Sequence, residues 1–138
     1  MRLHSRLKKT SVRKAELVAF ALDALARLGL GGEVGINVCS ARTMALFNRR
    51  FRGKKGPTDV LSFQDGAPGP EGWPYLGDIL IAGPVAQAAA EETGIPVGME
   101  MKRLVLHGIL HLAGFDHEKD GGRMMRKERA LRKEWGIS

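Results

Sequence analysis

The stretch LGDILIAGPVAQAAAEETG, residues 76–94, predicts a β-strand that leads directly into an α-helix. Its first six residues are mainly apolar, as expected of a strand in a buried sheet. Pro84 suits the first turn of the helix, where a backbone N–H donor is not needed. The helix should run through 85–92 and end at Gly94, because glycine adopts the left-handed C-cap conformation easily. A strand followed by a helix is the basic unit of an α/β domain.

Strands and helices also alternate before this stretch, and two further helices follow it. Ser40 is a suitable N-cap for one of the further helices. The other expected elements are an edge strand near 3–7, helices over about 12–28, 41–50, 97–113 and 120–135, and strands over 34–40 and 60–63. We therefore predict a single α/β domain over residues 1–138. Its central, mostly parallel mixed sheet should have about four strands, covered by about five helices.

The composition favours polyanionic partners. The chain carries 22 Lys and Arg residues against 15 Asp and Glu residues, a formal net charge of +7. RNA, DNA and an anionic membrane surface would all be attracted. A membrane is the weaker choice, because no apolar run approaches the roughly 18 to 20 residues of a spanning helix. The N-terminal MRLHSRLKK also lacks the apolar core of a secretion signal, so we expect a cytoplasmic protein.

The segment HGILHLAGFDH, residues 107–117, contains three of the four histidines of the chain. His107 and His111 are four residues apart on a predicted buried helix, so their side chains should share one face. Gly114 can end this helix at positive φ and turn the chain back, which would bring His117 to the same point. The spacing matches the H-E-x-x-H-x-x-G-x-x-H zinc pattern. We therefore predict one Zn²⁺ ion bound by these three histidines, with an open position for water.

Two simpler interpretations of the histidines fit the sequence less well. Core histidines without a metal would leave buried polar nitrogens unsatisfied, at about 1–3 kcal/mol each. A purely structural zinc site usually has four protein ligands, often cysteines. The single cysteine, Cys39, lies far from the histidines in a predicted strand, and it is expected to be a small buried apolar residue. Asp116 or Glu118 could add a fourth ligand, although Asp116 could equally orient a histidine.

Hydrolysis is the reaction class that an open zinc site suggests, because Zn²⁺ lowers the pKa of its water to about 7. Metalloproteases with this pattern use a glutamate beside the first histidine as the general base, and this chain has Gly108 there. Cleavage of a phosphodiester accumulates negative charge that Arg or Lys can stabilise. The basic segment 49–55 offers several such cations, most of which are expected to be solvated, with one facing the metal.

Three blocks of the sequence resemble the YbeY family of bacterial endoribonucleases, the rRNA maturation factors. HGILHLAGFDH resembles the zinc signature of that family, of the form HGxLHLxGxDH. FNRRFRGKKGPTDVLSF resembles its loop from asparagine to arginine followed by PTDVLSF, and LGDILIA resembles its LGDI strand. The blocks stand in the order of the family, and the similarity covers nearly the whole chain. Phe47 and Ala113 are minor departures from its usual leucines.

The resemblance implies a metal-dependent endoribonuclease, specific for single-stranded RNA, that acts in the cytoplasm. It implies a role in 16S rRNA 3′-end maturation and ribosome quality control, with rRNA and ribosomal particles as partners. The zinc ligands of the family correspond to His107, His111 and His117, and its functional arginine corresponds to Arg52. From the residues alone, two other classes stay open: a metalloprotease-like amide hydrolase, and a non-catalytic RNA-binding ribosome assembly factor with a structural metal.

Overall fold

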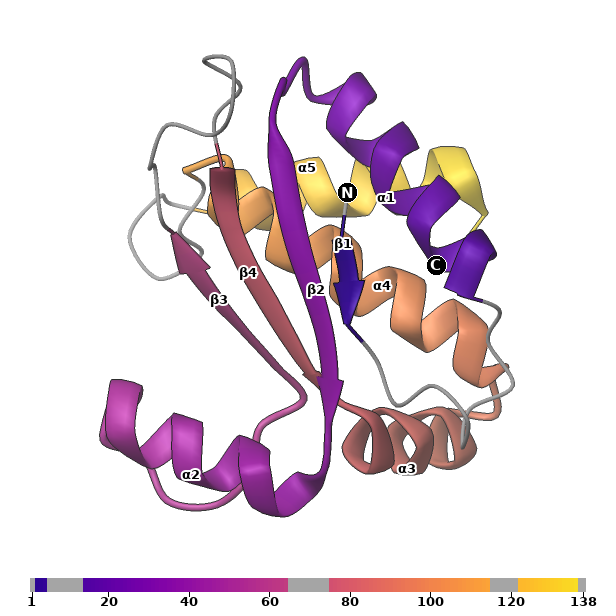
Figure 1. Cartoon of the computed structure of the whole chain (residues 1–138). Helices are drawn as coiled ribbons and strands as arrows, with labels where there is room; N and C mark the ends of the chain where they lie inside the picture. Colours follow the sequence, from indigo (N-terminus) through magenta and orange to yellow (C-terminus); the bar gives the residue numbers. More distant parts are fainter. Residues whose placement is uncertain (1, 5–13, 65–74, 115–121, 137–138) are drawn as a thin grey trace.

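The computed structural model describes residues 2–4, 14–64, 75–114 and 122–136. Strands and helices alternate over the first half of the chain, and three successive helices end it (Figure 1). In chain order the elements are β1 (Arg2–His4), α1 (Lys14–Arg27), β2 (Glu33–Cys39), α2 (Ala41–Arg52), β3 (Val60–Gln64), β4 (Tyr75–Ala82), α3 (Gly83–Thr93), α4 (Val97–Leu112) and α5 (Arg123–Trp135). The predicted small α/β domain with five helices is confirmed for this part of the chain.

The strands form one mixed sheet in the order β1-β2-β4-β3. Three longer strands make up most of it, and the three-residue β1 pairs along one edge. β2 is parallel to both β1 and β4, whereas β3 runs antiparallel to β4. Ile36 pairs with Ile79 across β2 and β4, and Leu61 pairs with Leu80 across β3 and β4. The sheet is therefore mostly parallel, as predicted, with the antiparallel β3 at its other edge.

Apolar side chains on the two faces of the sheet belong to two separate cores. Successive side chains of a strand point to opposite faces. Ile79 and Ile81 of β4 pack in the main core with α1 and α4, whereas Leu80 and Ala82 pack with Met44 of α2. The smaller core holds α2 against the end of the sheet where β2 and β4 finish.

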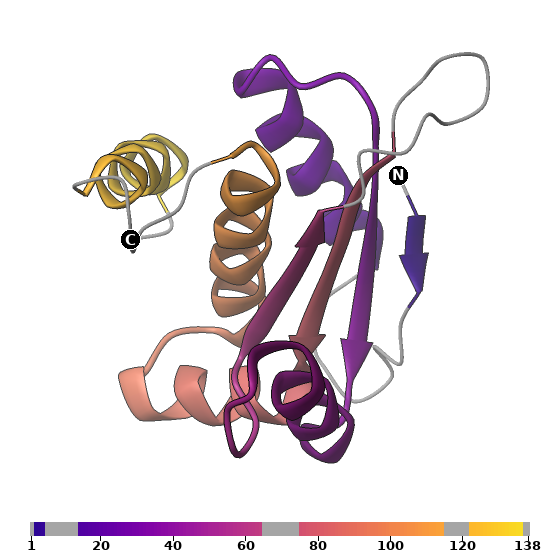
Figure 2. The same cartoon turned by 90° about the vertical axis from the view of Figure 1, so that its left-hand side faces the viewer.

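The helices do not cover the sheet evenly, whereas the sequence predicted a central sheet covered by helices. α1 and α4 cover one face, and α5 lies on the outer side of α4 (Figure 2). Of the described helices, α2 packs on the opposite face, at one end only, and beside it the sheet lines an open groove. Helical coverage is thus fuller on one face than on the other.

The caps of α2 explain its bounds. The Ser40 hydroxyl accepts a hydrogen bond from the Thr43 N–H at 3.1 Å, as expected of an N-cap. At the other end, Gly53 has φ +67° and donates its N–H to the carbonyl of Arg49. The helix therefore runs two residues beyond the predicted end at Arg50, and Arg52 lies in its last turn rather than in a loop.

Gly108 lets α4 lie directly on the sheet. A Cβ at this position would come within 2.8–2.9 Å of three side-chain atoms of Ile79, and both residues are buried. The glutamate that a metalloprotease would carry here has no room. The loss of the protease base inferred from the sequence thus has a packing reason.

Replacing Gly108 with alanine is expected to lower the free energy of unfolding by about 1–3 kcal/mol, the usual cost of overpacking a filled core. Denaturant unfolding followed by circular dichroism measures this loss. In a double-mutant cycle, Ile79→Ala should remove much of the added cost of Gly108→Ala, because it deletes the three contacting atoms. Additive effects of the two changes would show that this contact is not the cause.

No helix in the described part of the chain is long and apolar enough to cross a membrane.

Candidate metal centre

The first two predicted metal ligands lie on the polar stripe of α4. Glu100, Arg103, His107 and His111 follow one another at spacings of three and four residues, so they share a face of the helix. Most of the remaining side chains of α4 are apolar and buried against α1 and the sheet. The position of both histidines is therefore fixed by the packing of the helix that carries them.

His107 and His111 lie beside each other as the sequence predicts. Their ring centroids are 5.0 Å apart, and the ring planes are inclined by 70°. Two imidazoles on neighbouring turns of a helix can bind one metal ion with bonds of about 2.0–2.1 Å. This pair therefore fits as part of a histidine site for zinc.

Glu128 of α5 fixes the orientation of His107. Its Oε1 lies 2.8 Å from His107 Nδ1, and its side chain is 15% exposed. A metal-binding histidine commonly donates a hydrogen bond from one ring N–H to a carboxylate and binds the metal through its other ring nitrogen. With Nδ1 directed to Glu128, His107 would bind a metal through Nε2.

The surroundings of Glu128 keep it ionised. Burial opposes ionisation of its carboxyl group. The hydrogen bond to His107, together with the positive charges of His107, Arg132 and Arg103, outweighs burial and lowers the pKa of this carboxyl below its ordinary value. A carboxylate at this point accepts a hydrogen bond from the Nδ1–H group and makes the imidazole a better metal ligand.

Replacing Glu128 with glutamine is expected to weaken metal binding about 10- to 100-fold, the usual effect of losing such an outer carboxylate. Competition with a chromophoric chelator measures the affinity without any assay of activity. Glu134→Gln on the same helix is a matched control, because it removes a half-exposed carboxylate that pairs with Arg27 instead. Equal metal affinities in Glu128→Gln and the unmodified protein would contradict the orienting role.

Strand β3 holds the C-terminal end of α4 in place. Gln64 Nε2 donates to the backbone carbonyls of His111 and Leu112 at 3.1 and 3.5 Å. These carbonyls are among those that a helix leaves without an intrahelical partner. Gly114 then turns the chain at φ +98°, as predicted. The helix that bears the histidines is thus tied to the sheet at its C-terminal end.

The third predicted ligand, His117, lies outside the described residues, as do Asp116 and Glu118. Within the described part of the chain, no group of three His, Cys, Asp or Glu side chains could hold a metal ion. The structure thus brings together His107 and His111 of the predicted set. The three-histidine site and its zinc ion stay predictions.

Arg52 is exposed in the last turn of α2. Among the described residues, Arg52 makes no hydrogen bond or ion pair with either histidine of α4. The helix that carries Arg52 packs on the face of the sheet opposite α4. The predicted role of this arginine therefore needs a substrate that reaches both places.

Glu128 is the functional residue that the sequence analysis missed. It lies 21 residues from His107, on a helix that the sequence marks mainly as basic. One signal was available: Met124, Glu128 and Leu131 are four and three residues apart, so they share a helical face, and both apolar members are buried. An acid on the buried face of a basic helix indicates a specific partner.

Comparison with known proteins gives the family. The model of the family described as Endoribonuclease YbeY matches residues 3–136. The chain belongs to the YbeY family. Endoribonuclease YbeY of Aquifex aeolicus (strain VF5) is 41% identical over 127 residues, which are 91% of this chain and 83% of that protein. The counterpart from Koribacter versatilis (strain Ellin345) is 40% identical over 125 residues, 91% and 79% of the two chains.

A solved structure is also similar to this YbeY-family chain. The solution structure of TM1509 from Thermotoga maritima superposes with a TM-score of 0.61 at 25% identity, over 98% of this chain and 89% of that one. The family blocks quoted from the sequence occupy defined places in the fold. One lies on β4, one runs from α2 to β3, and the first part of the histidine block lies on α4. The resemblance to YbeY proteins is thus confirmed.

Proposed function

We propose that this chain is a metal-dependent endoribonuclease that cleaves single-stranded RNA. His107, His111 and His117 would bind one Zn²⁺ ion, and Arg52 would stabilise charge on the scissile phosphate. The observation that carries the proposal is the pair of histidines on α4, 5.0 Å apart, with His107 oriented by Glu128. This arrangement suits metal binding, and it occurs in a chain of a family named for endoribonuclease activity.

The chemistry divides between the ion and the side chains of the chain. When bound, Zn²⁺ would supply Lewis acidity and lower the pKa of a water to about 7. Glu128 keeps His107 in the orientation and tautomer that a ligand needs. Arg52 places a positive charge where the phosphate gains negative charge as its P–O bond breaks. The other cations of α2 and the following loop hold the strand.

We place this activity in the cytoplasm, in the maturation of the 3′ end of 16S rRNA and in ribosome quality control. Its substrates would then be rRNA and ribosomal particles. Membership of the YbeY family and the net charge of +7 support this placement. Depleting the protein from cells should therefore lead to accumulation of 16S rRNA with an unprocessed 3′ end.

The two alternatives fit less well. An amide hydrolase of the metalloprotease type needs a glutamate at position 108, where the side chain of Ile79 fills the space. A non-catalytic assembly factor with a structural metal would be expected to have a closed site with four protein ligands. Of these four ligands, the described residues provide only the two histidines of α4, and Glu128 contacts one of them.

One experiment separates the three functions. The purified full chain is incubated with labelled single-stranded RNA, the same RNA as a duplex, and casein, each with and without a zinc chelator. We expect cleavage of the single-stranded RNA only, lost with chelator and restored by added Zn²⁺. Cleavage of casein alone would support an amide hydrolase. A metal-loaded protein that cuts neither substrate would support the assembly factor. A 2′,3′-cyclic phosphate on the product would assign the attack to the ribose 2′-OH, whereas a 3′-hydroxyl on one product and a 5′-phosphate on the other would assign it to water.

A further inference from the structure

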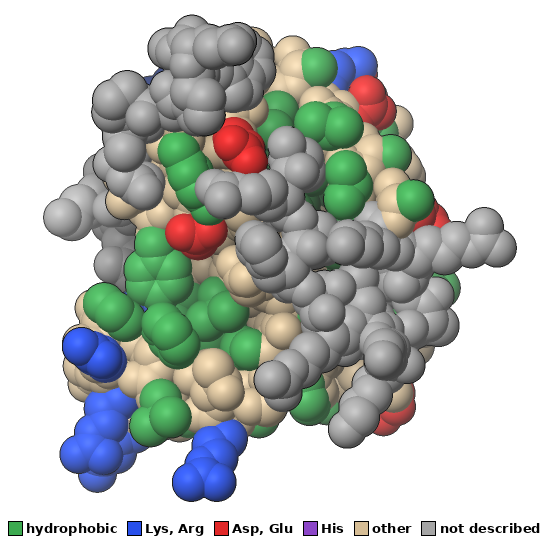
Figure 3. Space-filling view, in the orientation of Figure 1, with side chains coloured by type: hydrophobic (Ala, Val, Ile, Leu, Met, Phe, Trp, Pro, Cys, Tyr) green, Lys and Arg blue, Asp and Glu red, His purple; other side chains and the backbone are tan. Residues whose placement is uncertain are grey.

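The face of the sheet opposite α4 carries a groove of about 700 Å³. Its floor comes from β2, β3 and β4, and its wall comes from α2. Figure 3 looks onto this face and shows hydrophobic side chains gathered beside α2, with Lys and Arg side chains below them and acidic side chains above. Of the described residues, neither the histidines of α4 nor Glu128 line this groove.

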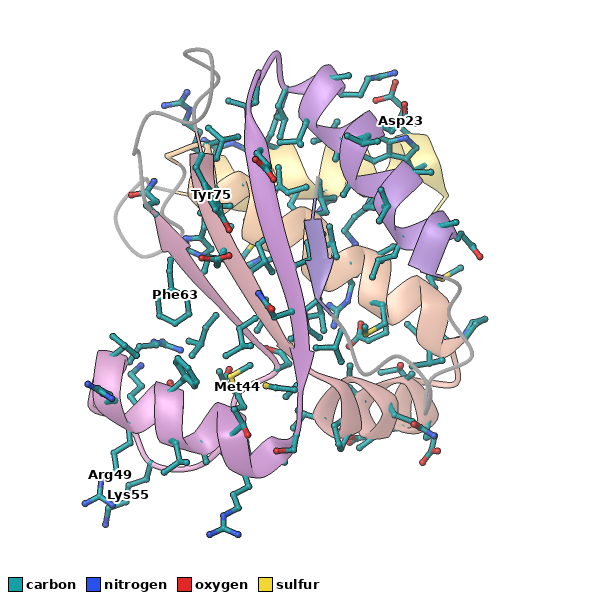
Figure 4. All side chains as sticks on the ribbon, viewed as in Figure 1. Asp23, Met44, Arg49, Lys55, Phe63 and Tyr75 are labelled. Atoms are coloured by element: carbon teal, nitrogen blue, oxygen red, sulfur yellow. The ribbon has the colours of Figure 1, made fainter. Side chains whose placement is uncertain are left out.

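Three phenylalanine rings form the apolar wall. Phe47 and Phe51 of α2 are stacked with centroids 5.6 Å apart and planes inclined by 19°. Phe63 of β3 meets both rings edge-on and points from its strand toward α2 (Figure 4). Mutual packing of this kind is ordinary in a small core, but Phe47 is 37% exposed and Phe51 is 56% exposed. The rings therefore present aromatic faces and edges to an incoming ligand.

Cations lie along one side of this aromatic wall. No acidic residue occurs between residues 41 and 58, whereas the same segment contains Arg42, Arg49, Arg50, Arg52, Lys54 and Lys55. The Arg50 guanidinium lies 5.7 Å from the centroid of the Phe51 ring, close enough for a cation–π contact. Arg49 and Lys55 point outward from α2 and its following loop (Figure 4). A ligand on the rings would thus have positive charge along its outer side.

The floor of the groove is polar and carries an acid. Asp78 of β4 accepts a hydrogen bond from the Tyr75 hydroxyl, and both side chains line the groove with Asn37. The pair lies over the backbone of Gly35, where any Cβ would collide with it. A carboxylate here would repel a phosphate but can accept hydrogen bonds from the N–H groups of a base.

We propose that this groove binds unpaired bases of an RNA strand. The bases stack on Phe51 and its neighbours, their edges face Asp78 and Asn37, and their phosphates lie toward the arginines of α2. Aromatic platforms flanked by cations are the usual way in which proteins bind single strands. A duplex keeps its bases paired and cannot offer them to the rings. The inference rests on the proposed function, because it assumes that RNA is the substrate.

Binding measured with chelator present tests the groove without any cleavage. The probe is a short fluorescent single-stranded RNA, and its anisotropy gives Kd. Phe51→Leu, which keeps apolar bulk but removes the ring, should weaken binding on the order of tenfold, and Phe51→Trp should retain it. Leu46→Ala is the matched control, because Leu46 is 63% exposed on the same helix but does not line the groove. Circular dichroism confirms that each variant is folded.

The possible outcomes distinguish a failure of the proposed RNA-binding groove from a failure of the proposed nuclease function. An unchanged Kd in Phe51→Leu, with RNA cleavage intact, would overturn the proposal that this groove binds RNA. Equal losses of binding to single-stranded RNA and to its duplex would also overturn it, since stacking requires unpaired bases. If the unmodified protein neither bound nor cut RNA, both the proposed RNA-binding groove and the proposed nuclease activity would be overturned. A selective loss for single strands in Phe51→Leu, restored in Phe51→Trp, would support the proposal.

Discussion

Replacing His111 with alanine is expected to abolish stoichiometric zinc binding and to reduce cleavage of single-stranded RNA on the order of a thousandfold. One of three ligands is lost, and the several kcal/mol of transition-state stabilisation that a metal supplies are lost with it. The backbone carbonyl of His111 that accepts from Gln64 remains, so the end of α4 should stay attached to β3. Metal analysis after dialysis and a cleavage time course measure the two effects.

A matched control for His111→Ala is His4→Ala. It removes another histidine of the chain, in β1, outside the predicted ligand set. That variant should keep both its zinc and its activity. A His111→Ala protein that holds one zinc ion per chain as tightly as the unmodified protein would exclude His111 as a ligand.

Replacing Arg52 with alanine is expected to lower the rate of RNA cleavage about 10²- to 10³-fold while zinc content stays the same. This is the usual loss when a group that stabilises charge in the transition state is removed. The side chain is exposed in the last turn of α2, so its removal should leave the stability of the fold nearly unchanged. Single-turnover rates and metal analysis on the same sample test both parts.

Arg42→Ala is the control for Arg52→Ala, because Arg42 is an exposed arginine at the other end of the same helix. It removes the same charge, so a general electrostatic effect on RNA binding would appear in both variants. A few-fold change in KM, with kcat unaffected, is expected for Arg42→Ala. If Arg52→Ala lost its zinc, the role of Arg52 would be structural instead.

Local signals were enough to predict most of the elements. The hydroxyl of Ser40 caps α2, and glycines at positions 94 and 114 lie where helices α3 and α4 finish. These features depend on residues only a few positions apart, so their interactions can be predicted from the spacing in the sequence. The approach of His107 to His111 is of the same kind, because one helical turn separates them.

Long-range contacts were not visible in the same way. Asp116 is the candidate that the sequence suggests for orienting a histidine, because it is near in the chain, whereas the residue that contacts His107 in the structure is Glu128, on another helix. The groove was missed for a similar reason: its wall and floor come from four elements that meet only in the folded sheet. Cys39, expected to be buried, lines this groove half-buried. Burial still raises the pKa of its thiol, which disfavours the thiolate.

The alternation of side chains along β3 has a consequence for the length of RNA that can be cut. Leu61 and Phe63 face α2 and the groove, whereas Ser62 and Gln64 contact the backbone of α4 beside the histidines. An oligonucleotide anchored by a base on Phe63 must pass around this outer strand before a phosphate reaches His111. The distance across the β-sheet would then set a minimum length for the RNA substrate. It would also fix the number of nucleotides between the base bound at Phe63 and the phosphodiester that is cleaved.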